Sequence, residues 1–126
     1  MAQHFTCLLI DDDTDDQEIF ILALKQIDDN IGCQVFDNGR TAIETLKQAP
    51  ELPNYIFLDL NMPLMDGRQC LQAIRQISRL DDVPVIIYST SSDPKDKQET
   101  LKLGAGHYIE KQASLPQLVK KLEYFF

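Results

Sequence analysis

The sequence lacks the features expected of membrane, secreted or nucleic-acid-binding proteins. Its 126 residues contain no apolar run of the length that a bilayer span requires. The first six residues include neither the positive segment nor the long apolar segment of a signal peptide. Lysine and arginine number 12 against 20 aspartates and glutamates, and the formal net charge is -8 with no basic cluster. We therefore expect a cytoplasmic protein with no membrane and no nucleic-acid partner. Its acidic surface suits a basic protein or a divalent cation.

Cysteine is scarce, and its spacing excludes a structural metal site. The three cysteines, Cys7, Cys33 and Cys70, lie far apart in the sequence, are odd in number and have apolar neighbours. This pattern predicts reduced thiols in the core of a cytoplasmic protein. The chain also lacks internal repeats, linkers and low-complexity segments. With 44% apolar residues, it suits one domain, 1–126, with a real core.

Short apolar runs alternate with segments of helical period along the whole chain. The runs predict strands at 7–10, 33–36, 56–58, 84–88 and 107–109. The periodic segments predict helices from 14 to 27, from 39 to about 48, from 67 to 77, from 95 to 103 and from 114 to about 125. Thr14 and Ser114 are each followed by glutamine three residues later, which predicts two capping boxes. Five strands alternating with five helices indicate an α/β fold with a parallel sheet covered on both faces.

Polar side chains follow four of the five predicted strands. Asp11 and Asp12 follow the first strand, Asp59 the third, Ser89 the fourth, and Lys111 the fifth. The carboxyl ends of parallel strands share one edge of the sheet, and a crevice opens where the strand order reverses. We therefore expect these side chains to meet at that edge.

Carboxylates gathered at one edge need a cation. Each pair at 4 Å costs on the order of 4 kcal/mol under an effective dielectric of 20. Magnesium removes that cost and takes oxygen ligands. The chain offers such ligands from Asp11, Asp12, Asp59 and the main-chain carbonyl of Asn61. Lys111 and Ser89 would then hold the other oxygens of a phosphoryl group while the Asp59 carboxylate attacks phosphorus.

These segments resemble the receiver domain of two-component response regulators, of the stand-alone CheY-like kind. The resemblance covers essentially the whole chain and depends on the segments 8–12, 58–67, 85–90 and 104–111. It implies a flavodoxin-like, doubly wound fold with a five-stranded parallel sheet in the order 2-1-3-4-5 and five helices. It also implies that the chain catalyses only its own phosphorylation and dephosphorylation.

The resemblance also implies a role for each site residue. The donor is a sensor histidine kinase carrying a phosphohistidine, and the downstream protein partner is unknown. Signalling would pass through a switch of the face made by the fourth helix, fifth strand and fifth helix. The implied roles are phosphoacceptor for Asp59, direct Mg²⁺ ligand for Asp12, mainly water-mediated Mg²⁺ ligand for Asp11, main-chain Mg²⁺ ligand for Asn61, phosphate-pairing amine for Lys111, switch hydroxyl for Ser89 and aromatic switch for Tyr108.

Other interpretations of the same residues stay open or fail on spacing. The chain could instead be a phosphorelay shuttle or phosphate sink that passes phosphate to a histidine phosphotransfer protein. An aspartyl-phosphate phosphatase of the haloacid-dehalogenase type needs a threonine in a different register from Thr14. A calcium loop starting at Asp11 needs glycine and glutamate where Asp16 and Leu22 stand. Tyr108 could equally be an ordinary half-buried aromatic residue.

The segment after the fifth strand departs from the receiver pattern. Gln112 stands where receivers usually have a proline joined by a cis bond. A cis bond before a non-proline residue costs about 2.5–4 kcal/mol. We therefore expect a trans bond between Lys111 and Gln112. Asp13, Asp15 and Asp16 are interpreted as helix-start acids favoured by the helix dipole.

Overall fold

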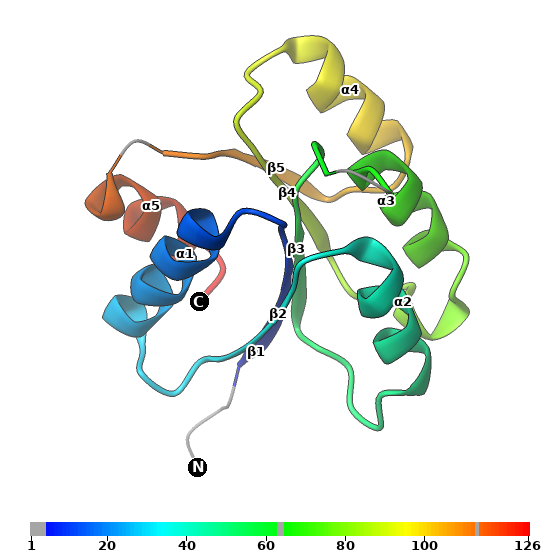
Figure 1. Ribbon diagram of the computed structural model, residues 1–126, viewed down its shortest axis with the longest axis horizontal. Helices are drawn as coiled ribbons and strands as arrows, with labels where there is room; N and C mark the ends of the chain where they lie inside the picture. Colours follow the sequence, from blue (N-terminus) through cyan, green and yellow to red (C-terminus); the bar gives the residue numbers. More distant parts are fainter. Residues whose placement is uncertain (1–4, 63–64, 113) are drawn as a thin grey trace.

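Strands and helices alternate along the chain in a computed structural model that describes residues 5–62, 65–112 and 114–126 (Figure 1). The strands are β1 (Thr6–Ile10), β2 (Gly32–Phe36), β3 (Tyr55–Leu58), β4 (Val85–Ser89) and β5 (His107–Glu110). The α-helices are α1 (Thr14–Ile27), α2 (Gly39–Gln48), α3 (Gly67–Arg75), α4 (Pro94–Lys102) and α5 (Leu115–Leu122). A 3₁₀ turn, Ser78–Leu80, follows α3 and was not predicted. The predicted third helix was therefore too long, because the chain leaves the α-helix at Arg75.

All five strands are parallel and lie in the order β2-β1-β3-β4-β5. This confirms the predicted order. The chain runs outward from β1 to the edge strand β2, and then returns to β3 on the other side of β1. The strand order therefore reverses between β1 and β3, and the loops after these two strands leave in opposite directions. A crevice at the carboxyl ends of β1 and β3 follows from this topology.

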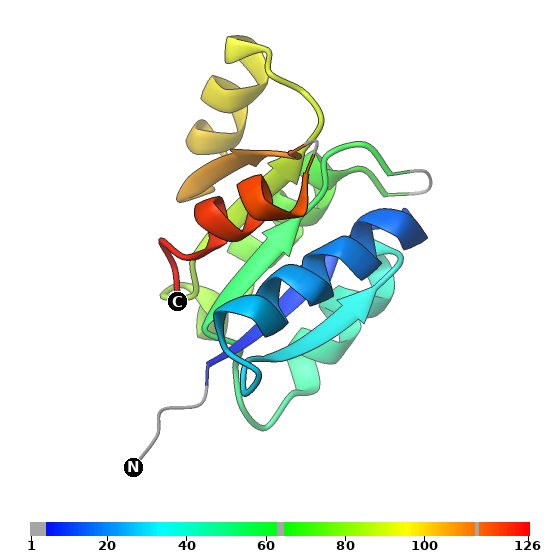
Figure 2. The same ribbon diagram turned by 90° about the vertical axis from the view of Figure 1, so that its left-hand side faces the viewer.

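Helices cover both faces of the sheet, with α1 and α5 side by side on one face and α2 and α3 on the other (Figures 1 and 2). Alternate residues of each strand therefore enter two separate cores. Leu8 and Ile10 pack on the α2–α3 side, whereas Leu9 packs with Phe20 and Phe57 on the α1–α5 side. Every residue of β4 is buried, as expected for a central strand with both faces covered.

Side-chain caps mark where the helices begin. The predicted cap at Ser114 is present and accepts a hydrogen bond from the Gln117 N–H, and Asp93 caps α4 by accepting from the Lys95 N–H. The predicted capping box at Thr14 was wrong. Asp13 is the N-cap of α1 and accepts from the Asp16 N–H at 3.1 Å, while the Gln17 side chain donates to the Asp11 carbonyl instead. A carboxylate caps a helix at least as well as a hydroxyl, so the acid before Thr14 takes that position.

The cysteines are unpaired thiols. Cys7 and Cys70 are buried, as predicted, whereas Cys33 is only half-buried because β2 is an edge strand. Burial raises the pKa of Cys70 to about 12. Over the described ranges, no helix combines the length and apolar character needed to cross a bilayer.

Candidate phosphoacceptor and cation site

Main-chain hydrogen bonds fix the residues that follow the strands. The Asp11 N–H donates to the Phe36 carbonyl of β2, and the Asp59 N–H donates to the Ile10 carbonyl of β1, both at 2.9 Å. The Lys111 N–H donates to a β4 carbonyl at 2.8 Å. Each residue thus extends its strand's hydrogen-bonding by one position. The rigid sheet, rather than a loop, therefore sets the starting direction of each functional side chain.

Three carboxylates meet at the carboxyl ends of β1 and β3. Asp11, Asp12 and Asp59 each offer an oxygen, and these oxygens all lie within 4.8 Å of one another. Asp11 and Asp59 are buried, whereas Asp12 is exposed. The cluster is therefore closed on the protein side and open towards solvent.

Lys111 brings the compensating positive charge. Its Nζ lies 2.8 Å from Asp11 Oδ2, 2.7 Å from Asp16 Oδ2 and 3.6 Å from Asp59 Oδ2. Its side chain is 9% exposed, so these interactions are shielded from water. Burial alone would lower the pKa of Lys111, but the contacts with Asp11 and Asp16 outweigh it and raise the pKa. Lys111 therefore stays an ammonium.

Burial acts on the acids in the opposite sense. It raises the pKa of Asp59 to about 6, with Lys111 opposing the change and Asp11 adding to it. Burial also raises the pKa of Asp11, again opposed by Lys111. The neighbouring ammonium therefore only partly relieves the electrostatic cost of the cluster, so a further cation would be stabilising here.

The donor set fits a hard divalent cation. Asp11 Oδ2 is buried and, although it contacts the Lys111 ammonium, has no hydrogen-bond partner among the described residues. An open cleft of about 400 Å³ adjoins it, lined by Asp12, Asp13, Asp16, Asp59, Asn61, Thr90 and Lys111. The Asn61 N–H donates to Asp59 Oδ1 at 3.4 Å, which holds that loop against the acid. Carboxylate and carbonyl oxygens beside open space are what Mg²⁺ requires, since it keeps several waters.

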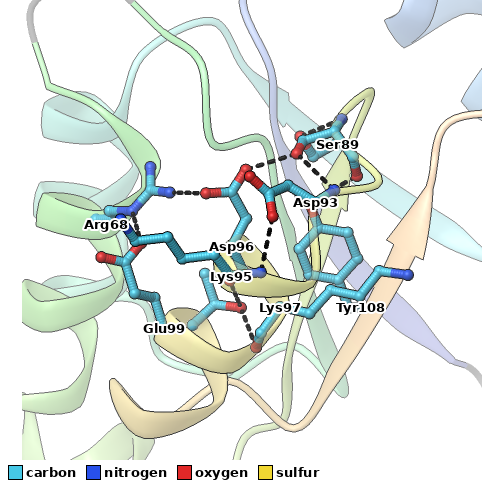
Figure 3. Close-up of polar contacts among 10 residues, drawn as sticks. Arg68, Ser89, Asp93, Lys95, Asp96, Lys97, Glu99 and Tyr108 are labelled. Atoms are coloured by element: carbon cyan, nitrogen blue, oxygen red, sulfur yellow. Dashed lines mark hydrogen bonds and ion pairs between the residues drawn. The ribbon is translucent and has the colours of Figure 1, made fainter.

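Ser89 and Tyr108 lie in one polar cluster (Figure 3), and both hydrogen-bond the main chain of Ser91. Ser89 is buried, and its hydroxyl oxygen accepts from the Ser91 N–H at 3.2 Å. The Tyr108 hydroxyl donates to the Ser91 carbonyl at 2.9 Å, and its ring is half-buried. The Lys97 ammonium lies 5.7 Å from the centre of that ring. The structure thus places Asp12, Asp59, Asn61 and Lys111 in the lining of the cleft, with Asp11 buried against Asp59 and Lys111. It connects Ser89 with Tyr108 through Ser91.

Comparisons with known proteins agree with this arrangement. The family model of the response regulator receiver domain matches residues 7–123. The chain belongs to the response regulator receiver family. This receiver is 31% identical over 121 residues to the response regulator Rcp1 of Synechocystis sp.. The alignment covers 92% of this chain and 82% of Rcp1. The family and its place in two-component signalling are therefore as predicted.

Solved structures support the same conclusion for the receiver's fold. The crystal structure of the phosphorylated cyanobacterial phytochrome response regulator RcpA superposes with a TM-score of 0.87 at 29% identity, over 97% of this chain and 91% of RcpA. The crystal structure of the Mn²⁺-bound form of Rcp1 gives a TM-score of 0.82 at 29% identity, over 95% of this chain and 90% of that chain. A receiver of this fold thus binds a divalent cation, and the present chain has an acidic cluster of the kind such a cation needs.

The receiver site contains residues that the sequence did not single out. Asp16 was interpreted as a helix-start acid, yet it hydrogen-bonds Lys111. Its position in the first turn of α1, close after the acids that follow β1, was the available signal. Arg68 was not singled out, although it forms ion pairs with Asp96 and Glu99 of α4. These partners are about 30 residues distant in sequence, and no local pattern indicates such a contact.

The segment after Lys111 takes the predicted backbone form. The Lys111–Gln112 bond is trans, and the Gln112 side chain donates back to the Glu110 carbonyl at 2.6 Å. Lys111 reaches Asp59 in this backbone form, so the missing proline does not remove the amine from the site.

Proposed function

We propose that this receiver accepts a phosphoryl group on Asp59 from the phosphohistidine of a sensor histidine kinase, in a Mg²⁺-dependent reaction. The single observation that carries the proposal is the position of Lys111 Nζ, 2.8 Å from Asp11 and 3.6 Å from Asp59, above an open acidic cleft. A buried carboxylate beside a fixed ammonium and two further acids has little use in a structural role. It suits a nucleophile that must receive a negatively charged group.

The chain's own residues supply the nucleophile and the charge compensation. An Asp59 carboxylate oxygen forms a bond to phosphorus while the bond from phosphorus to the histidine nitrogen breaks. The electron pair of that bond leaves with the imidazole, so the products are an acyl phosphate and a free histidine. Lys111 stays protonated and pairs with a phosphoryl oxygen, and the Ser89 hydroxyl donates to another. A bound Mg²⁺, held by Asp11, Asp12, Asp59 and the Asn61 carbonyl, would neutralise the remaining charge.

Signalling would use the cluster beside the cleft. Movement of the Ser89 hydroxyl towards the phosphoryl group would pull on Ser91, which Tyr108 also contacts. This links the site to the face formed by α4, β5 and α5. The proposal places the chain in the cytoplasm, where thiols such as Cys7 stay reduced, and includes no turnover of external substrates.

Intact-mass measurement after incubation with acetyl phosphate and Mg²⁺ tests the chemistry. We expect one added phosphoryl group in the native chain and none in Asp59→Asn. Asp37→Asn is the matched control, because Asp37 is an exposed acid that follows the edge strand β2. Labelling that persists in Asp59→Asn would refute the assignment of the acceptor. Turnover of simple phosphate esters that is abolished by Asp59→Asn would favour a phosphatase.

A second measurement separates a switch from a shuttle or sink. Hydrogen exchange of α4 and β5 is compared with and without beryllofluoride, a stable phosphoryl mimic. Changed protection over this face would support the switch. Unchanged protection together with transfer of the phosphoryl group to a histidine phosphotransfer protein would favour the shuttle.

A further inference from the structure

Ser91 connects four polar groups at the start of the β4–α4 segment. Its N–H donates to the Ser89 hydroxyl oxygen at 3.2 Å, and its carbonyl accepts from the Tyr108 hydroxyl at 2.9 Å. Its own hydroxyl donates to Asp96 Oδ2 at 2.5 Å and accepts from the Asp93 N–H at 3.2 Å. The position of Ser91 therefore sets the positions of both residues that the proposed switch uses.

Asp96 holds Ser91 from the first turn of α4. One carboxylate oxygen accepts from Ser91, and the other lies 2.5 Å from Arg68 Nη2 (Figure 3). The Asp96 side chain is 24% exposed, so these charge-assisted bonds are partly shielded. Both oxygens must accept at once, and among the polar side chains only a carboxylate can do this here. Asp96 thus links α3 to the β4–α4 segment.

Arg68 is in turn held against the phosphoacceptor strand. It follows Gly67, whose N–H donates to the Leu60 carbonyl at 2.9 Å. A Cβ at Gly67 would lie 2.3 Å from the Asp59 carbonyl oxygen, so the backbone of α3 packs directly on the backbone of Asp59. The backbone of Arg68 is therefore held in a fixed position relative to the phosphoacceptor Asp59. Its Nε also contacts Glu99 on the next turn of α4, at 3.1 Å.

We propose that Arg68 is a positioning residue for the phosphoryl-transfer site, acting through Asp96 and Ser91 on Ser89 and Tyr108. Arg68, Asp96 and Ser91 form the α3–α4 clasp. The clasp orients the Ser91 main chain, so the Ser89 oxygen is held as an acceptor while its hydrogen is left to face the phosphoryl group. The same main chain offers its carbonyl to Tyr108. This role deepens the proposed function of Asp59 and rests on it.

A matched pair of variants isolates the clasp from the general charge of α4. Asp96→Asn keeps the shape of the side chain but provides one acceptor and one donor, so it cannot accept from Arg68 and Ser91 together. Glu99→Gln removes the same charge from the same helix and touches Arg68 without contacting Ser91. Phosphorylation by acetyl phosphate with saturating Mg²⁺ is followed by intact mass. We expect Asp96→Asn to react about fivefold more slowly, the scale of one typical hydrogen bond, and Glu99→Gln to stay within about twofold of the native rate, as for an exposed pair.

A second measurement needs no phosphorylation. The unphosphorylated chain is labelled with 3-fluorotyrosine, and the Tyr108 resonance is identified by its loss in Tyr108→Phe. We expect Asp96→Asn, Arg68→Gln and Ser91→Ala each to shift this resonance, and Glu99→Gln to leave it in place. The shift in the double variant Asp96→Asn with Ser91→Ala should be smaller than the sum of the two single shifts, because both changes break the bond between Ser91 and Asp96. Arg68→Lys should shift the Tyr108 resonance less than Arg68→Gln does, because the lysine ammonium keeps the positive charge but lacks the planar guanidinium that contacts two acids at once.

The outcomes distinguish failure of the clasp from failure of the phosphoryl chemistry. A native reaction rate and an unmoved Tyr108 resonance in Asp96→Asn would overturn the clasp while leaving Asp59 as the acceptor. Equal slowing in Asp96→Asn and Glu99→Gln would also overturn it, because charge alone would then explain the rate. If the native chain is not phosphorylated, the proposed function fails, and the fluorine resonance still decides whether the clasp acts. If Asp96→Asn does not fold, Arg68→Gln takes its place in both measurements.

Discussion

Asp16 and Lys111 lie 95 residues apart in the sequence, yet the Lys111 ammonium donates to Asp16 Oδ2 at 2.7 Å. This contact is shorter than the 3.6 Å between the same ammonium and Asp59 Oδ2. In the unphosphorylated chain, Lys111 is therefore shared between Asp16 and Asp11, with Asp59 at longer range. The incoming phosphoryl group would have to compete with these acids for the ammonium.

Asp16→Asn should destabilise the fold by removing one charged acceptor of Lys111. Because the Asp16 side chain is 31% exposed, we expect the free energy of unfolding to fall by about 1 kcal/mol rather than by the larger value of a fully buried pair. Asp15→Asn is the control, since Asp15 lies in the same first turn of α1 and is exposed. Urea denaturation at neutral pH measures both. Equal losses would mean that the helix dipole, rather than Lys111, accounts for the effect.

Gly67→Ala should be strongly destabilising because of the close approach of α3 to the acceptor strand. The added Cβ would lie 2.3 Å from the Asp59 carbonyl oxygen and 2.6 Å from Leu60 Cα, both backbone atoms that cannot turn away. We expect a loss on the order of 2–4 kcal/mol, measured by thermal or urea unfolding. Gly32→Ala is the matched control, because its Cβ would meet Thr6 Cγ2 at an ordinary 3.5 Å. A similar loss at both glycines would contradict this account.

The fold was predictable because the alternation of apolar runs and helical periods spans the whole chain. Once the strands are parallel, Asp11, Asp59 and Lys111 must lie at one edge, and their carboxylate and ammonium groups do meet there. Five parallel strands in sequence leave few topologies, so the position of the cleft follows from connection rules rather than from side-chain detail.

What escaped prediction depends on contacts between elements. The hydrogen bond between Asp16 and Lys111 joins opposite ends of the chain, and the ion pair between Arg68 and Asp96 joins two helices. Neither has a local signature. The helix-start error at Thr14 is of another kind, since two adjacent residues could both cap α1 and Asp13 took the position. Sequence spacing locates a helix terminus more reliably than it identifies the capping atom.

The stability of the metal-free chain should fall as the pH rises through the range in which Asp59 ionises. Burial raises the pKa of Asp59 from an ordinary 3.8 to about 6. Between these values the folded chain keeps a proton that the unfolded chain has released, so folding is favoured at the acidic end and loses that contribution by about pH 6. The loss from this group is on the order of 3 kcal/mol, because each pKa unit corresponds to about 1.36 kcal/mol and the value of about 6 already includes the opposing effect of Lys111.

Asp59→Asn tests this pH dependence directly. The amide carries no charge, so the variant should be more stable than the native chain above pH 6 in chelator, and the difference should shrink towards pH 4. Unfolding by urea at several pH values, with Asp37→Asn as a control for loss of an exposed acid, provides the measurement. A native chain more stable than Asp59→Asn at neutral pH would show that Lys111 fully compensates the buried charge.

Magnesium should stabilise the native chain by relieving the same repulsion. A ligand at one hundred times its dissociation constant adds about 2.7 kcal/mol to the free energy of unfolding, which for a chain of this size raises Tm by several degrees. Asp12→Asn should lose most of that increase, because Asp12 is the exposed member of the three-carboxylate cluster and its removal leaves two acids. Asp37→Asn should keep the full increase, since Asp37 lies outside the cleft. Thermal unfolding with and without Mg²⁺ measures the difference. An equal increase in Asp12→Asn and the native chain would place the cation elsewhere on this acidic surface.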